Sequence, residues 1–329
     1  MAATWRALRR TVLTPSMSAA SISKRGFHEK SPAARELLDT VGKMFLTGYA
    51  YAAEARTVIE TENRIEQLPQ QYRGFAYEGA GMGYAVRDGL PFGSSHNVAD
   101  FLASRAESHV YMVYVGVGWA MARLPRFRWA KVSSAVPDPL LRWLVLDGYG
   151  FHQAYFHTDK YVHRQYREPA FPWPAEGPRS YADRAIDQGV GRAMWFVGGT
   201  DPNLVADMID KFPESRRSDL YAGSGLAATY AGGVDEQELR TFQRRAGVYA
   251  GQVAQGSAFA ATARVETGLV TEHTELATRV LCGVTPEQAT AISRQARPEP
   301  GAGTAHVPAF ELWRQGISAG LTAMQGATP

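Results

Sequence analysis

The sequence has one cysteine among its 329 residues, Cys282. A single cysteine excludes a disulfide within the chain, and it excludes zinc and iron–sulfur sites built from several cysteines. Cys282 lies in an apolar run before Gly283, so we expect a buried small side chain and not a nucleophile. So little cysteine suits a reducing compartment, and we predict a cytoplasmic protein, with membrane association through partners as a further option.

Long apolar runs are also missing. The longest spans Val110–Ala122, whereas a helix needs about 20 apolar residues to cross a bilayer. We therefore predict no transmembrane segment and interpret this run as a buried helix. The 35 basic residues barely exceed the 32 acidic ones and are not interleaved with aromatic residues, which argues against a nucleic-acid-binding protein.

Several catalytic and cofactor motifs are absent. Without G-x-x-x-x-G-K-[ST], the Gly-rich runs are a poor match to a phosphate-binding loop. There is no G-x-S-x-G to support a serine hydrolase and no C-x-x-C-H for covalent haem attachment. The lack of a Glu-x-x-His pair weakens the case for a di-iron site built from helices.

Glycine, in contrast, is abundant and partly periodic. Phe75–Gly89 resembles Asp219–Gly233 when the two are aligned without gaps, with Tyr and Gly at matching positions. At the same shift along the chain, Ile65–Arg73 resembles Ile209–Arg217. An ordered series of matches at one shift predicts an internal duplication.

Two further matches extend this series. The apolar run Val110–Ala122 resembles Val248–Ala260, at a slightly shorter shift. The tripeptide Gly-Phe-His occurs at residues 26–28 and again at residues 150–152. We interpret each tripeptide as the opening of one half, with a Pro-rich insertion in the second half around residues 167–180.

The predicted fold is mainly α, with two tandem related helical halves packed with pseudo-twofold symmetry. The halves comprise residues 1–149 and 150–270, a C-terminal helical extension comprises residues 271–329, and together they are expected to form one compact unit. Tight helix crossings are expected at the two Gly-rich runs, residues 79–83 and 223–227. Proline after Ser, Thr or Asp predicts helix starts at Ser31-Pro32, Asp201-Pro202 (Thr200 being the alternative cap), Thr285-Pro286 and Thr14-Pro15.

Histidines and acids gather in the run "GFHQAYFHTDKYVHRQY", residues 150–166. If the run is one helix, His152 and His163 lie about 16 Å apart along its axis and cannot chelate one ion together. Asp159 and His163 are four residues apart and face each other. Three interpretations remain open for this pair: general acid–base catalysis, two ligands of a metal completed by another helix, or a surface ion pair.

Three other residues are candidates because of their context. His28 and His152 follow the same Gly-Phe, so they would suit a metal or haem iron if the halves face each other; the alternative is a structural corner. Glu78 lies in an apolar run, where an unpaired acid is costly, and Ala222 replaces it in the second half. That difference suggests a function for Glu78 in one half only. Asp147 and Asp187 have similar apolar surroundings.

Four runs carry a resemblance to a known family. They are "RGFHEKSPAARELLDTVGKMFLTGYAYAAEA", "YRGFAYEGAGMGYAVRDGL", "LLRWLVLDGYGFHQAYFHTDKYV" and "AIDQGVGRAMWFVGGTDP". With them, residues 5–320 resemble the actinobacterial family of unknown function encoded in enediyne antitumour-antibiotic gene clusters. The resemblance implies a place in the cassette that accompanies the enediyne polyketide synthase and its thioesterase. That cassette converts a linear conjugated polyene toward a polyyne-type precursor of the enediyne core.

The resemblance brings no catalytic residues with it, so the candidates come from the sequence alone. We expect an enzyme, or an enzyme subunit, that oxidatively modifies the polyene with help from other cassette proteins. Its candidate catalytic residues are His152, Asp159, His163 and Glu78. His28 and His152 are candidate ligands of a metal or haem. The alternative is a non-catalytic scaffold that holds the apolar polyene in a tunnel lined by Tyr, Phe, Trp and Gly.

Overall fold

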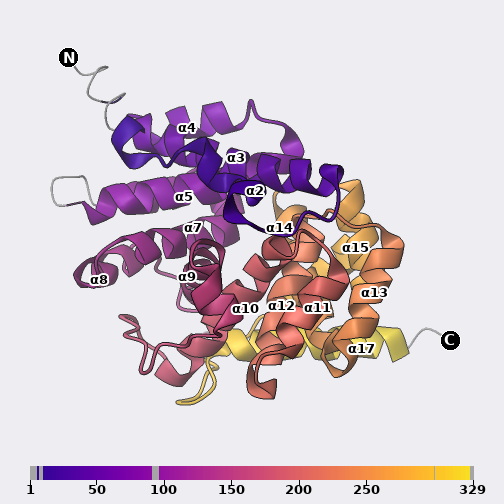
Figure 1. The fold of residues 1–329 in the computed structure, drawn as a ribbon. Coiled ribbons are helices and arrows are strands. Elements are labelled where there is room, and N and C mark those ends of the chain that lie inside the picture. Colours follow the sequence, from indigo (N-terminus) through magenta and orange to yellow (C-terminus); the bar gives the residue numbers. More distant parts are fainter. Residues whose placement is uncertain (1–5, 7–9, 91–95, 300, 327–329) are drawn as a thin grey trace.

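The computed structural model describes residues 6, 10–90, 96–299 and 301–326, and these residues form helices and no β-strand (Figure 1). The prediction of a mainly α fold is therefore confirmed. The long helices are α3 Pro32–Glu54, α5 Arg73–Gly89, α7 Val110–Arg123, α9 Trp143–Phe156, α10 Arg179–Val197, α12 Glu214–Tyr230, α14 Ala250–Glu266 and α17 Ala309–Gly326.

Shorter helices connect and cover the long ones. The short α-helices are α2 Ile22–Arg25, α4 Val58–Ile65, α6 Asn97–Leu102, α8 Trp129–Ser133, α11 Pro202–Asp210, α13 Glu236–Ala246, α15 Glu272–Cys282 and α16 Pro286–Gln295. The single-turn elements are η1 Met17–Ala20, η2 Gln70–Tyr72, η3 Arg105–His109, η4 Arg126–Arg128, η5 Asp159–His163 and η6 Gly247–Tyr249. No helix among the described residues is both long and apolar enough to cross a membrane.

Each long helix from α3 to α14 packs against the next long helix along the chain. The order of packing is α3, α5, α7, α9, α10, α12 and α14, and α17 then packs against α14 and α16. Figure 1 shows the early helices, in indigo and magenta, beside the later ones in orange, with α17 in yellow at the lower edge. Because neighbours in sequence are neighbours in space, the large side chains of all these helices can meet in the middle of the molecule.

The predicted helix starts are confirmed at three of four positions. Ser31, Asp201 and Thr285 cap α3, α11 and α16, each with proline as the first helical residue. The prediction at Thr14-Pro15 is wrong, because Thr14 ends a preceding helical turn through its bond to the carbonyl of Arg10. The next element, η1, is capped instead by the Ser16 side chain.

Glycines mark the closest helix crossings, as predicted. A Cβ on Gly79 would lie 1.9 Å from the carbonyl oxygen of Phe45, and a Cβ on Gly223 would lie 1.9 Å from that of Gln188. No side chain fits at these distances, so only glycine allows α5 to touch α3 and α12 to touch α10 so closely. The Gly-rich runs are therefore packing surfaces.

The same contacts recur in both parts of the chain. The Tyr77 hydroxyl donates to Glu66, and the hydroxyl of Tyr221, at the matched position of the repeat, donates to Asp210. Arg73 and its match Arg217 each donate to the carbonyls of the residues five and seven positions earlier. The helices around α5 and around α12 are thus built alike, while a pseudo-twofold axis between them stays a prediction.

The alignment of α7 with α14 differs from the predicted one. Gly116 of α7 and Gly256 of α14 contact the carbonyls of the matched residues Glu78 and Ala222. These two glycines are therefore equivalent in the structure, whereas the sequence match paired Gly118 with Gly256. The structural alignment of the two helices is thus displaced from the predicted one by two positions.

The Gly-Phe-His tripeptides are not equivalent. Gly26 ends α2 with a φ of 71°, whereas Gly150 lies inside α9 against the carbonyl of Ile186. The expected boundary between residues 149 and 150 therefore falls within a helix. Residues 167–178 are irregular, as their proline content predicts.

Substituting Gly79 by alanine should destabilise the protein strongly. The new Cβ would push α5 away from the α3 backbone, and overpacking of this kind typically costs about 1–3 kcal/mol. Gly251 of α14 is the matched control, because the nearest atom to its Cβ position is a serine hydroxyl 3.2 Å away that can rotate. Urea unfolding should show a lower midpoint for Gly79→Ala and an unchanged or slightly higher one for Gly251→Ala. Equal midpoints would contradict the close-contact role of Gly79.

Candidate functional site

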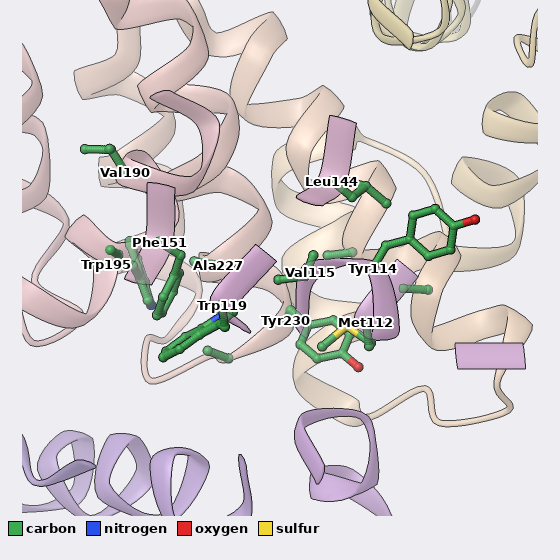
Figure 2. Packing of buried hydrophobic residues seen from close by; sticks show 14 of the residues in the cluster. Met112, Tyr114, Val115, Trp119, Leu144, Phe151, Val190, Trp195, Ala227 and Tyr230 are labelled. Carbon is green, nitrogen blue, oxygen red and sulfur yellow. The ribbon is translucent and has the colours of Figure 1, made fainter. Parts of the chain in front are cut away.

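A cavity of about 560 Å³ lies between the long helices. Its wall is mainly aliphatic and aromatic, and residues of α3, α5, α7, α9, α10, α12, α14 and α17 all contribute to it. Figure 2 shows part of this wall, with Trp119 beside Phe151 and Met112 near Val115 and Tyr230. The cavity has the size and apolar lining typical of a site for a small organic molecule.

Helix α7 runs along the cavity. Its lining residues extend from Tyr111 to Arg123, which corresponds to about 18 Å along a helix axis. Beside Tyr111 is Trp313 of α17, which is buried. At the opposite end the lining residues Arg123 and His157 are exposed to solvent. The cavity is therefore elongated, and it reaches the surface near Arg123.

Three charged side chains interrupt the apolar wall. Glu78 on α5, Asp147 on α9 and Arg192 on α10 all line the cavity, and they are only 3%, 4% and 8% exposed. Arg192 donates a hydrogen bond to Asp147, and its other terminal nitrogen lies 3.6 Å from the Glu78 carboxylate. One guanidinium thus serves two carboxylates, and Asp147 has the closer contact.

This arrangement makes Glu78 titratable near neutral pH. Burial raises the pKa of Glu78 to about 7; Arg192 opposes this shift and Asp147 adds to it. Burial also raises the pKa of Asp147, while Arg192 lowers it. Because Arg192 hydrogen-bonds Asp147, Glu78 is the carboxyl group that can most easily exchange a proton with a molecule in the cavity.

Aromatic rings surround the position between this cluster and the surface near Arg123. The Trp119 ring centroid lies 4.4 Å from that of Phe45 and 5.0 Å from that of Phe151. The His152 ring meets Trp119 edge-on at 5.6 Å. Burial lowers the pKa of His152 to about 3, and the nearby charges of Arg123 and His157 contribute. His152 is therefore a neutral imidazole at neutral pH.

The structure brings two of the predicted site residues together and separates the others from them. Glu78 and His152 both line the cavity. The continuous helix expected over residues 150–166 is wrong, because α9 ends at Phe156 and a turn of π-helix follows at Asp159–His163. Asp159 and His163 are exposed, and Asp159 pairs with Arg164. Neither lines the cavity.

His28 lies apart from His152. It is exposed, with Nε2 3.9 Å from a carboxylate oxygen of Asp201, and it does not line the cavity. The two histidines therefore do not face each other across the fold, because the tripeptides that contain them are not equivalent. Within the part of the chain that the structure describes, no group of three or more His, Cys, Asp or Glu side chains is placed to hold a metal ion.

Sequence reasoning missed Arg192 and Trp119. Arg192 lies in an apolar helical run, and a lone arginine in such a run signals a buried ion pair. Gly48 and Gly191 contact the carbonyls of Ala76 and Leu220, which occupy matched positions of the repeat. The residues that follow these two glycines, Tyr49 and Arg192, are therefore also matched. Like Glu78, Arg192 thus departs from the repeat, and the same comparison that singled out Glu78 could have found it. Trp119 carries no such signal.

The prediction that the single cysteine is a buried small side chain is confirmed. Cys282 is fully buried and donates a hydrogen bond to the carbonyl of Ala254. Burial raises the pKa of its thiol to about 12, so it is not a thiolate at neutral pH.

Comparison with known proteins gives a family without a function. No curated protein and no solved structure matches the chain. Residues 4–321 match the family described as "Protein of unknown function (DUF1702)". Because the match covers nearly the whole chain, this protein belongs to that family.

The Glu78 carboxyl should make stability depend on pH. Its pKa is near 4.5 when unfolded and about 7 when folded, so the unfolded state ionises first as the pH rises. The stability that protonated Glu78 confers is complete below about pH 4.5 and is lost as the pH rises through 7. Relative to Glu78→Gln, the wild type should lose up to about 3 kcal/mol between about pH 5 and 8. Urea unfolding of both proteins across this pH range measures the difference between their free energies of unfolding. A difference that does not change with pH would contradict a raised pKa of Glu78.

Removing Arg192 should leave two buried carboxylates without a cation. Arg192→Met should therefore destabilise the protein by about 3–5 kcal/mol. Adding Glu78→Gln and Asp147→Asn to that variant removes the uncompensated charges, so most of the loss should be recovered. Thermal unfolding of the single and triple variants measures this. A triple variant as unstable as Arg192→Met would show that packing, and not charge, accounts for the effect.

Proposed function

We propose that this protein binds a long, apolar, conjugated molecule in the cavity and that Glu78 exchanges a proton with it. The observation that carries this proposal is one titratable carboxyl group, with a pKa of about 7, in the wall of an elongated apolar cavity. A volume of about 560 Å³ accommodates a molecule of substantial size, because ligand cavities typically measure about 300–1,000 Å³.

The shape of the cavity favours an extended ligand. The lining face of α7 is about 18 Å long, similar to an extended medium-length hydrocarbon chain. Aromatic rings at Phe45, Trp119 and Phe151 offer flat surfaces beside this path. Such surfaces suit a flat conjugated chain better than a branched or globular one.

The chemistry of Glu78 supports proton transfer. A general acid or base works best when its pKa lies near the working pH, and burial brings the pKa of Glu78 there. Its partner Arg192 stabilises the carboxylate that forms when the proton leaves. The apolar surroundings exclude water, which strengthens these charge interactions.

The resemblance to enediyne-cluster proteins supplies the substrate class, a linear conjugated polyene. The oxidative conversion of this polyene removes two hydrogens and forms one further carbon–carbon π bond. Glu78 would take one hydrogen as a proton. The other would leave as a hydride to a flavin or nicotinamide acceptor, which a partner protein of the cassette would supply. A metal or haem shared by His28 and His152 is not part of the proposal, because these residues lie in different environments.

A second function is a carrier that holds the polyene without changing it. The observation that favours it is the ion pair between Arg192 and Asp147, which gives Arg192 a structural role without any substrate. Under this alternative Glu78 would only complete the buried charge cluster, and it would exchange no proton with the ligand.

Two measurements separate these functions. 1,6-Diphenylhexatriene, an apolar conjugated probe that fluoresces when bound, should bind one molecule per chain. Ala227→Phe, which fills the cavity, should weaken binding by about ten-fold or more, whereas Ala33→Phe on the exposed face of α3 should not. Failure of the wild type to bind, or equal binding by both variants, would exclude the cavity as the site.

The proton exchange is tested with the polyene in deuterated water. The wild type should transfer solvent deuterium to the bound polyene, as measured by mass spectrometry. Glu78→Gln should bind diphenylhexatriene as well as the wild type but exchange at least about 100-fold more slowly. If the wild type binds the polyene and transfers no deuterium, with or without the partner protein that supplies the hydride acceptor, the carrier function is the correct one.

A further inference from the structure

The last residue of α7 places a positive charge at the rim of the cavity. This residue, Arg123, lines the cavity and is exposed to solvent. Among the residues that the structure describes, Arg123 forms no ion pair and donates no hydrogen bond. Its guanidinium is therefore available to a molecule that enters the cavity.

The charge of Arg123 lies beside the cavity wall. Burial is the main cause of the low pKa of His152 on α9, and Arg123 lowers it further. Burial raises the pKa of Tyr49 on α3, and Arg123 opposes that shift. Because one cation acts on residues of both helices, the guanidinium lies near both α3 and α9. His157, another exposed lining residue, also lowers the pKa of His152 and so lies on the same side of the cavity.

Other charged groups on this side already have partners. Arg25 donates to the carbonyl of Tyr155 and lies 4.3 Å from the Phe156 ring centroid. Asp39, whose charge reaches Tyr155, accepts a hydrogen bond from the backbone N–H of Ile22. The described residues thus leave this rim with positive charge in excess.

The opposite end of the lining face of α7 differs in charge. Arg294 and Arg297 act on the pKa of Tyr111 there, but they pair with Glu266 and Asp138. Neither of these two arginines lines the cavity. Of the two ends, the one near Arg123 is therefore better suited to an anionic group.

We propose that the ligand has a carboxylate at one end of its apolar chain and that Arg123 binds this carboxylate at the rim of the cavity. This inference rests on the proposed function, because it concerns the same ligand, and it specifies a polyene carboxylic acid and not a hydrocarbon. A guanidinium binds a carboxylate through two parallel hydrogen bonds. At the rim the carboxylate stays partly hydrated, which avoids most of the cost of burying a charge.

The charges of the wall select one orientation of the chain. Trp119 precedes Arg123 by about 6 Å along the α7 axis. Burial raises the pKa of Glu78, and Trp119 is close enough to oppose this shift. A chain whose carboxylate binds Arg123 therefore passes Glu78 close to its carboxylate end and extends along α7 toward Tyr111. The reverse orientation would place the carboxylate where the nearby cations are already paired.

The test compares two ligands that differ in charge and hardly in size. Parinaric acid, a conjugated tetraene with a terminal carboxylate, fluoresces when bound, and its primary amide is uncharged. At about pH 8, where the free acid is ionised, the wild type should bind the acid about five- to ten-fold more tightly than the amide. This preference should shrink as NaCl rises from about 0.01 M to about 0.15 M, because salt screens exposed charges.

Substitutions assign the preference to Arg123. Arg123→Gln should reduce it to about two-fold or less, with the affinities for the amide and for diphenylhexatriene nearly unchanged. Arg123→Lys keeps the charge and should retain part of the preference. Arg128→Gln is the matched control, because Arg128 is close in sequence but contacts the Phe127 ring and does not line the cavity. It should keep the preference.

The remaining outcomes separate this inference from the proposed function. If diphenylhexatriene binds but the acid and the amide bind equally well, the carboxylate site is refuted and the proposed function stands. If Arg123→Gln keeps the preference, or Arg128→Gln loses it equally, Arg123 is not the site. If Arg123→Gln weakens all three ligands alike, its role is structural and the inference is again refuted. If none of the probes binds to the wild type, the proposed function fails as well.

Discussion

Close backbone contact between neighbouring helices is the constraint on which the rest of this fold depends. At Gly79 and Gly223 the helices meet with no room for a Cβ, and Gly118 of α7 and Gly189 of α10 make the same kind of contact with α9. Helices that touch along such small faces must direct their large side chains elsewhere. Those side chains meet in the middle of the molecule, where fixed backbones prevent the rings from closing the space between them. The cavity therefore follows from the way the helices cross.

The second part of the chain uses the same framework differently. There a network of ion pairs binds α17 to α10 and α12. Its members are the buried Asp219, Glu311 and Arg314 and the half-buried Arg184. The positions that match Arg184, Gln188, Asp219 and Gln255 in the first part are Val41, Phe45, Phe75 and Val115, and all four line the cavity. One copy of the framework is thus filled by charges and an added helix, and the other is left apolar and open. This difference, more than the shared contacts, determines where a ligand can bind.

Much of the fold, and part of the site, was predictable from sequence. Helix starts at Ser31, Asp201 and Thr285 depend on local capping, and the repeated Tyr and Gly positions depend on contacts that reuse the same residues. Glu78 was found because Ala222 occupies its matched position. The stretch after Phe156 was mistaken because spacing alone does not show where a helix ends, and the Asp159 pairing with Arg164 depends on that end. The Gly-Phe-His match failed because three residues do not specify a backbone conformation.

The position of Arg192 shows why the site lies where it does. Other buried acids have closer partners. Asp187 pairs with both Arg167 and Arg216, and Asp88 accepts hydrogen bonds from the backbone N–H groups of Asn97 and Val98. Glu78 has no cation in its own part of the chain and depends on Arg192 from α10, which already binds Asp147. Burial raises the pKa of Glu78 to about 7, and a cation that lies 3.6 Å away and is shared with Asp147 offsets only part of that shift. The charge of the Glu78 carboxylate is thus only partly balanced by Arg192, which leaves Glu78 able to gain or lose a proton beside the cavity.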